Sequence, residues 1–142
     1  IAVAERGAKF GFSEARLGLI AATISPYVVA AIGPRASRGL FASARTFDAD
    51  EALRLGLVSE LVEDAAALAT VADRIAGEAM ACAPGAIAAS KALVDAVAGR
   101  DIDHAVMEDT ARRIAHARIS DEGREGVAAF LARRPPAWAG QV

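Results

Sequence analysis

The feature that most constrains the fold of this chain is an imbalance between a few short strand patterns and several longer helical ones. Apolar or extended stretches typical of strands cover residues 1–4, 9–12, 45–47 and 57–62. Strands so few and so short do not form a stable sheet by themselves. The opening Ile-Ala-Val-Ala also resembles the middle of a strand. We therefore expect the chain to belong to a larger protein, in which a preceding segment supplies the strand partners.

Helical patterns occupy most of the remaining sequence. The clearest one has Asp48 as a favoured N-cap, Glu51 in position to complete a capping box, and Gly56 just past the end. Apolar spacing, capping residues and prolines predict helices over residues 26–32, 34–41, 48–55, 64–79, 84–98, 102–114 and 120–131. The sequence therefore predicts a single Ala-rich domain of the α/β or α-rich class.

Composition excludes several functions. The net charge of −2 and the absence of a basic stripe argue against a nucleic-acid partner, and no apolar run is long enough to span a bilayer. The one cysteine, Cys82, cannot form an internal disulfide, which favours a reducing, cytoplasmic compartment; its Ala-rich surroundings predict that it is buried. His104 and His116 show no ligand spacing, so we expect no metal site.

One carboxylate is a candidate for chemistry. Glu14 directly follows Ser13 at the end of the predicted strand over residues 9–12, and apolar sequence lies on both sides. Ser13 can cap the turn that follows. By itself the pattern most often describes a solvated Glu stabilised by the N-terminal dipole of a helix. A functional carboxylate is the alternative.

Three blocks of sequence resemble the crotonase (enoyl-CoA hydratase/isomerase) family. Residues 8–20 match a segment like Ala-Lys-Phe-Gly-x-x-Glu-x-x-Leu-Gly-Leu-Ile, and residues 45–58 match Arg-x-x-Asp-Ala-x-Glu-Ala-Leu-x-x-Gly-Leu-Val. Residues 125–135 match Glu-Gly-x-x-Ala-Phe-x-x-Arg-x-Pro. The blocks follow in order along essentially the whole chain, which resembles the C-terminal half of such a protein.

The resemblance implies a fold and its division. The expected class is α/β, as the C-terminal part of a crotonase-like ββα spiral that is predominantly helical in this segment. Residues 1–62 would be the C-terminal portion of the spiral core, and residues 63–142 a helical trimerisation region. Homotrimers or dimers of trimers are the assemblies that the family implies.

The resemblance also implies a reaction. Family hydratases add water to the double bond of a 2-enoyl-CoA thioester, using two glutamates and two backbone N–H groups that stabilise an enolate-like oxygen. Glu14 matches the second glutamate, whereas the first glutamate and both N–H donors are expected upstream of Ile1. Coenzyme A is then part of the substrate and no separate cofactor is implied. The alternatives are an isomerase of the same family and a non-catalytic helical module for oligomerisation or CoA binding.

Further residues match family positions that contact the substrate. Ser13, Leu17 and Ala22 correspond to substrate-binding positions, and Ala22 replaces a Gly found in many hydratases. Residues 21–27 resemble a subgroup acting on branched acyl-CoAs, including methylglutaconyl-CoA-type hydratases. Phe130 and Arg133 match positions that reach a neighbouring subunit's CoA. From the residues alone, Phe130 could equally be a core aromatic and Arg133 a solvated surface residue.

Overall fold

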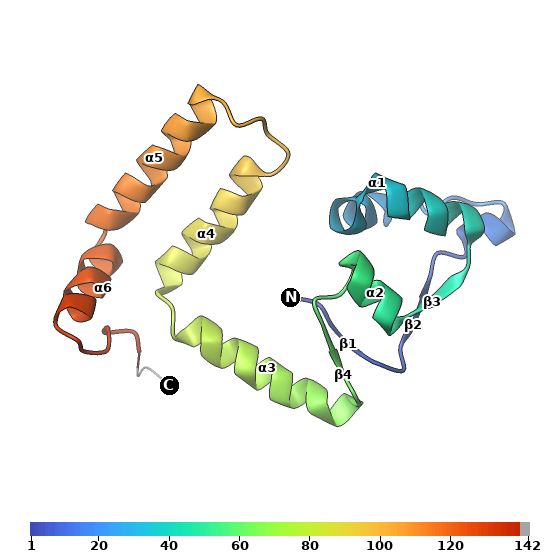
Figure 1. The fold of residues 1–142 in the computed structure, drawn as a ribbon, viewed down its shortest axis with the longest axis horizontal. Coiled ribbons are helices and arrows are strands. Elements are labelled where there is room, and N and C mark those ends of the chain that lie inside the picture. The colour runs from blue at the N-terminus through green and yellow to red at the C-terminus, as the bar shows by residue number, and fades with distance from the viewer. Residues whose placement is uncertain (140–142) are drawn as a thin grey trace. The chain divides into compact units, whose positions relative to one another are not determined.

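A computed structural model describes residues 1–139. The chain forms two compact units, Ile1–Ala72 and Asp73–Val142, and the boundary between them falls inside helix α3 (Ala65–Met80). The elements follow in the order β1, β2, η1, α1, β3, α2, β4 and then α3 to α6, where η1 is a short 3₁₀ helix (Figure 1). The predicted division at residue 62 concerns the core and the trimerisation region of a larger protein, and it stays a prediction.

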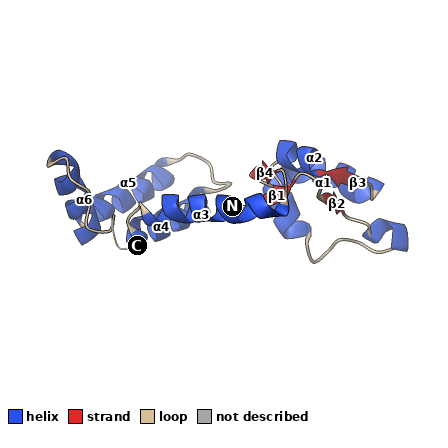
Figure 2. Ribbon diagram, turned by 90° about the horizontal axis from the view of Figure 1, so that it is seen from below, coloured by secondary structure: helices blue, strands red, loops and turns tan. Residues whose placement is uncertain are grey.

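The strands of the described residues all lie in the first unit (Figure 2). β1 (Val3–Glu5) pairs in parallel with β4 (Glu60–Val62). β2 (Lys9–Gly11) pairs antiparallel with β3 (Thr46–Asp48), which places Phe10 opposite Phe47. Each sheet has two strands, so every strand keeps an edge that no described strand covers. This agrees with the expectation that these strands need further partners.

An aromatic cluster centres the core of the first unit. Phe12 packs edge-on against Phe41, with ring centroids 5.0 Å apart, and Phe47 stacks on Phe10 at 5.7 Å. Such ring pairs add stability beyond the area that they bury. The buried core residues are Phe12, Val28, Leu40, Phe47, Ala52 and Val58. Because Phe12 is buried in this core, it fixes the position at which the segment that follows it begins.

The first long helix bends where the sequence predicts a break. α1 (Ser25–Ser43) contains Gly33 at φ 76° and ψ 164°, followed by Pro34, so two helices meet at a kink. The positive φ favours glycine, and proline cannot continue the hydrogen-bonding ladder of the preceding turn. The buried Ser37 hydroxyl donates to the Gly33 carbonyl oxygen at 2.8 Å, which satisfies a backbone group at the bend.

The second helix confirms half of the predicted capping box. α2 (Ala49–Leu55) begins after Asp48, whose Oδ1 accepts a hydrogen bond from the Glu51 N–H at 2.9 Å, and it ends at Gly56 with φ 81°. The other half is wrong, because the Glu51 carboxylate accepts two hydrogen bonds from Arg45, at 2.6 and 2.7 Å. These bonds hold the pKa of Glu51 below its ordinary value. The nearby Arg side chain outcompetes a backbone N–H for the carboxylate.

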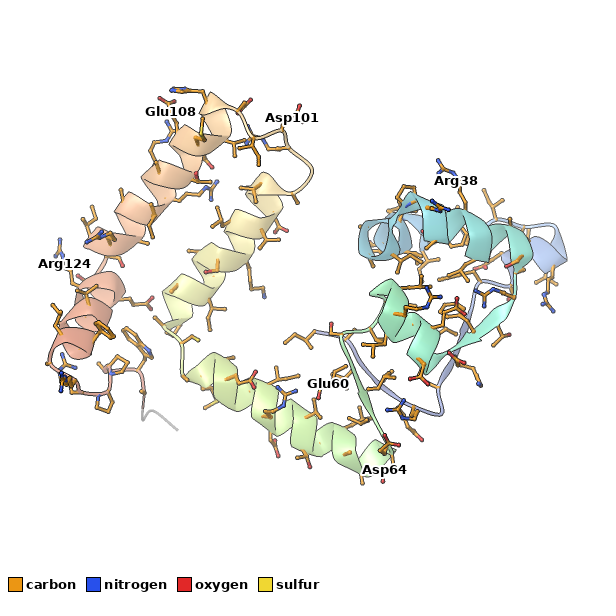
Figure 3. The ribbon with its side chains drawn as sticks, viewed as in Figure 1. Arg38, Glu60, Asp64, Asp101, Glu108 and Arg124 are labelled. Carbon is orange, nitrogen blue, oxygen red and sulfur yellow. The ribbon has the colours of Figure 1, made fainter. Side chains whose placement is uncertain are left out.

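The rest of the chain is helical, as predicted. α3 (Ala65–Met80) starts in the first unit, with Asp64 accepting from the Ala67 N–H at 2.9 Å, and the Asp64 side chain lies at that helix end (Figure 3). The helices that complete the second unit are α4 (Pro84–Val97), α5 (His104–Ile119) and α6 (Asp121–Leu131). Asp103 caps α5 and Ser120 caps α6 in the same way.

Glu122 ties two helices of the second unit together. Its carboxylate oxygens accept hydrogen bonds from the N–H groups of Gly85 and Ala86, at 2.9 and 3.0 Å. Both donors belong to the first turn of α4, where backbone N–H groups lack partners within the helix. The carboxylate of α6 therefore caps α4.

Two expectations from composition have different outcomes. Cys82 is exposed after the end of α3, so the prediction that it is buried is wrong; its thiol donates to the Glu78 carbonyl oxygen at 3.5 Å. In residues 1–139, no single helix is long and apolar enough to cross a bilayer. α3 and α4 together meet the requirements of length and composition, but they are bent by 102°.

Candidate active site around Glu14

The local sequence places Glu14 at a corner fixed on both sides. β2 leads into the buried Phe12, and Ser13 occupies the N-cap position of η1 (Glu14–Leu17). Gly18 ends η1 at φ 71°, a conformation that glycine adopts without strain. The Leu19 N–H donates to the Glu14 carbonyl oxygen at 3.0 Å, which closes the turn. Glu14 is therefore the first residue of a short, well-defined helical turn beside the core.

A small cavity lies next to this turn. Its volume is about 130 Å³. Apart from Glu14, its lining is apolar, and Phe41 contributes a wall from the last turn of α1. The lining residues are Phe12, Glu14, Ala15, Leu19, Ile20, Ala21 and Phe41. Ligand sites share this mostly apolar lining with a few polar groups, but they usually measure about 300–1,000 Å³, so this cavity can hold only a small part of a ligand.

The Glu14 carboxyl group has an unpaired oxygen at this position. Oε2 is buried and has no hydrogen-bond partner in the described part of the chain. Leaving a buried polar atom unpaired costs about 1–3 kcal/mol, so such atoms are rare unless they have a role. A water molecule or the polar group of a ligand would remove this cost. The geometry favours the functional interpretation of Glu14 over a solvated side chain.

Large apolar side chains on η1 and just after it are exposed. Leu17 on η1 and Ile20, which lines the cavity, are 74% and 82% exposed in this chain. Large exposed apolar patches are typical of ligand-binding or protein-binding faces. The surroundings of Glu14 are therefore suited to a largely apolar group.

The other predicted substrate-binding residues differ in their placement. Ser13 is exposed and its side chain makes no capping hydrogen bond, so the predicted cap is wrong. Leu17 lies on η1 but does not line the cavity. The Ala22 N–H donates to the Ile20 carbonyl oxygen at 2.8 Å, so a local turn uses this donor. Their contacts with a substrate stay predictions.

Phe130 and Arg133 lie together at the end of α6. Phe130 is 81% exposed, so its interpretation as a core aromatic is wrong for this chain. Arg133 adopts a left-handed conformation with φ 51°, and its N–H donates to the Phe130 carbonyl oxygen at 3.1 Å. The structure shows no ion pair of Arg133 with residues 1–139, whereas Arg134 forms two hydrogen bonds with Glu125. Both predicted CoA contacts are thus available to a ligand.

Sequence reasoning missed Arg16. Its Nε donates to the Ala44 carbonyl oxygen at 2.9 Å, across 28 positions of sequence. A contact between an Arg and a backbone carbonyl so far away leaves no local pattern to detect.

The described residues contain no group of three or more His, Cys, Asp or Glu side chains that could hold a metal ion.

Comparison with known proteins decides the family. The sequence model of the enoyl-CoA hydratase/isomerase family matches residues 1–141. This chain belongs to that family. The fold agrees, because solved structures of the enoyl-CoA hydratase/isomerase family superpose on the chain with TM-scores of about 0.9. The predicted fold class, an α/β part of a crotonase-like fold, is confirmed.

Three members illustrate the similarity. A Thermus thermophilus protein provisionally named enoyl-CoA hydratase is 32% identical over 140 residues, covering 96% of this chain and 53% of the relative. The crotonyl-CoA hydratase of Syntrophomonas wolfei is 32% identical over 133 residues, covering 93% of this chain and 50% of the relative. The crystal structure of a Legionella pneumophila protein, provisionally named an enoyl-CoA hydratase/isomerase (crotonase), has a TM-score of 0.90 and 48% identity, covering 97% and 53%. The chain thus spans about half the length of the relatives that it matches.

Proposed function

We propose that this chain is part of an acyl-CoA hydratase, which adds water to the double bond of a 2-enoyl-CoA thioester. The observation that carries the proposal is the buried, unpaired Oε2 of Glu14, a residue that lines an apolar cavity, in a member of this enzyme family. A carboxyl group in this setting can accept a proton from water or deliver one to carbon. The name of the Syntrophomonas wolfei relative, a crotonyl-CoA hydratase, favours the same reaction.

The reaction needs three further groups, two backbone N–H groups and a second glutamate, which we place upstream of Ile1. Water forms a bond from its oxygen to C3 and gives up a proton, while C2 gains a proton and the thioester oxygen passes through an enolate-like state. Two backbone N–H groups would stabilise that oxygen, each contributing about 3–4 kcal/mol. A second glutamate would share the proton transfers with Glu14. The coenzyme A portion arrives with the substrate, so we propose no separate cofactor.

The remaining predicted residues take supporting roles in the proposal. Ser13, Leu17 and Ala22 border the acyl group, which we propose to be branched because residues 21–27 resemble that subgroup. Phe130 and Arg133 contact the coenzyme A of a neighbouring subunit in a homotrimer or a dimer of trimers. The exposure of Phe130 and the lack of an ion pair at Arg133 in the described residues support this role. We propose a cytoplasmic location and no nucleic-acid or membrane partner.

Glu14→Gln tests the proposal in a polypeptide of the relatives' full length. Removing the proton-transfer group should lower kcat by roughly 10²- to 10⁴-fold. The measurement is the loss of absorbance of the conjugated double bond of a 2-enoyl-CoA. Glu63→Gln is the matched control, because that exposed carboxylate pairs with Arg6 and lies outside the cavity. Unchanged activity of Glu14→Gln would show that Glu14 takes no part in the reaction, and a parent protein without activity would favour the non-catalytic module.

An isomerase is the second candidate, because it can work with one carboxylate and the cavity contains one. An isomerase moves a proton between carbons without adding water. Incubation with a 3-enoyl-CoA would then produce a gain of absorbance at the conjugated double bond. A hydratase consumes that absorbance when it starts from a 2-enoyl-CoA.

A further inference from the structure

The segment that carries Glu14 has few polar contacts with the rest of its unit. Residues 13–24 form backbone hydrogen bonds mainly among themselves, and η1 has no buried residue. In residues 1–139, the structure shows one hydrogen bond from this segment to a residue outside positions 13–28. Arg16 Nε donates it to the Ala44 carbonyl oxygen at 2.9 Å. η1 also packs against α1, and the Arg16 hydrogen bond is the polar link that the described residues show between this segment and the end of α1.

The acceptor of the Arg16 hydrogen bond, the Ala44 carbonyl group, belongs to a buried residue at the end of α1. Ala44 is the C-cap of α1, is 6% exposed, and adopts a left-handed conformation at φ 46°. Its N–H donates to the Leu40 carbonyl oxygen at 3.0 Å, and Leu40 belongs to the core. The Ala44 carbonyl group is thus held by the end of α1, and a charged donor makes a stronger hydrogen bond to it than a neutral donor would.

The same hydrogen bond connects two walls of the cavity. Glu14 and Ala15 line it from η1, and Phe41 lines it from the last turn of α1. Arg16 follows Ala15, and Ala44 lies less than one helical turn beyond Phe41. A change in the Arg16 contact would therefore alter the distance between these walls, and with it the place of the Glu14 carboxyl group.

We infer that Arg16 is a positioning residue, which holds the Glu14 carboxyl group in place by fixing η1 to the end of α1. This role rests on the proposed function of Glu14. Arg16 itself does not line the cavity and touches no reacting atom in this arrangement. A displacement of about 1 Å in a catalytic group can lower a rate by roughly 10²-fold, so a tether of this kind has a large effect on kcat.

The test compares Arg16→Met and Arg16→Lys in a polypeptide of the relatives' full length. Methionine keeps the apolar stem and removes the donor, and we expect kcat to fall about 10- to 100-fold with KM within about threefold. Lysine keeps a charged donor and should recover part of the loss. Arg38→Met is the matched control, because the Arg38 side chain points outward from α1 (Figure 3) and should leave kcat unchanged.

A second measurement separates positioning from a general structural role. In the Glu14→Gln background, Arg16→Met should lower the residual kcat no further, because it acts through a carboxyl group that is already absent. Equal losses in both backgrounds would overturn the inference. Equal kcat of Arg16→Met and the parent would overturn it as well. Should Arg16→Met fail to fold, Arg16→Lys is compared in the same two backgrounds with the same criteria.

The outcomes also distinguish this inference from the proposed function. If Glu14→Gln retains full activity, the proposed role of Glu14 in the reaction is wrong and Arg16 has nothing to position. If Glu14→Gln is impaired and Arg16→Met is not, the proposed function stands and only the positioning role is wrong.

Discussion

At the scale of single residues, Arg133 has an unfavourable backbone conformation. It occupies the position just past the C-cap of α6 at φ 51°, where the N–H groups of Arg133 and Arg134 donate to the carbonyl oxygens of Phe130 and Ala129. Glycine is the favoured residue in this motif, and the left-handed conformation costs other residues about 1–2 kcal/mol. We predict that Arg133→Gly raises the unfolding free energy by about 0.5–1 kcal/mol, after the added flexibility of the unfolded chain is subtracted.

The same substitution should weaken binding. An Arg fork suits phosphate, so the proposed role of Arg133 predicts a higher KM for the CoA thioester in Arg133→Gly. Arg133→Ala is the matched control, because it removes the charge and keeps the strained conformation. Thermal unfolding and steady-state kinetics on all three proteins provide the comparison. A melting temperature of Arg133→Gly at or below that of Arg133→Ala would contradict the prediction.

Patterns at the scale of single residues predicted which residues are functional candidates better than they predicted the surroundings of those residues. The motif around Glu14 identified the carboxylate, and the apolar residues next to it do line a cavity. The unpaired Oε2, the left-handed Arg133 and the Arg16 contact depend on packing between distant segments, which no local pattern contains. Cys82 shows the reverse error, since Ala-rich sequence predicted burial of a residue that is exposed.

At the scale of elements, one carboxylate fastens the segment after α6. Glu125 accepts two hydrogen bonds from Arg134, at 2.7 and 2.9 Å, and one from the Ala137 N–H at 2.9 Å. The Arg134 hydrogen bonds are the main reason that the pKa of Glu125 falls to about 2. A lowered pKa in the folded state means that the stabilisation is complete above about pH 4.5 and is lost as the pH falls through that value toward 2.

We therefore predict that residues 134–137 detach from α6 in acid. Nuclear magnetic resonance can follow the Glu125 carboxyl signal and the Ala137 amide signal from pH 5 to pH 2. Glu125→Gln is the control, and its Ala137 amide signal should not titrate in that range. A midpoint for Glu125 near 4.5 in the parent protein would show that the pairing is too weak to matter.

Elements were the most predictable level of this structure. Capping residues, prolines and glycines located the helices, because each satisfies or removes a backbone group at a helix end. Asp48, Ser120 and Gly33 lie where these rules placed them. The side chain of Glu51 did not follow the rule, because Arg45 from the neighbouring extended segment supplies a stronger donor.

At the scale of the whole molecule, the sequence identified the family and the class of fold but not the pairing of strands. The parallel pair β1–β4 joins residues that are far apart in sequence, and the parallel direction follows from the crossover between them rather than from either strand's composition. The uncovered strand edges and the exposed apolar residues near Glu14 indicate surfaces that this chain does not cover by itself. No pattern in this sequence identifies what covers these surfaces.

Assembly is the last property that follows at this scale. Met107 and Ile114 are 53% and 62% exposed and lie seven positions apart on α5, so they share one face, and Phe130 on α6 is 81% exposed. Apolar faces of this kind are typical of interfaces between subunits. We predict that the protein of the relatives' full length sediments as a trimer or a dimer of trimers, and that Ile114→Asp shifts it to smaller species because burying a charge is costly. Arg124→Gln, an exposed polar change on α6, should leave the sedimentation unchanged (Figure 3). A monomeric parent protein would contradict the prediction.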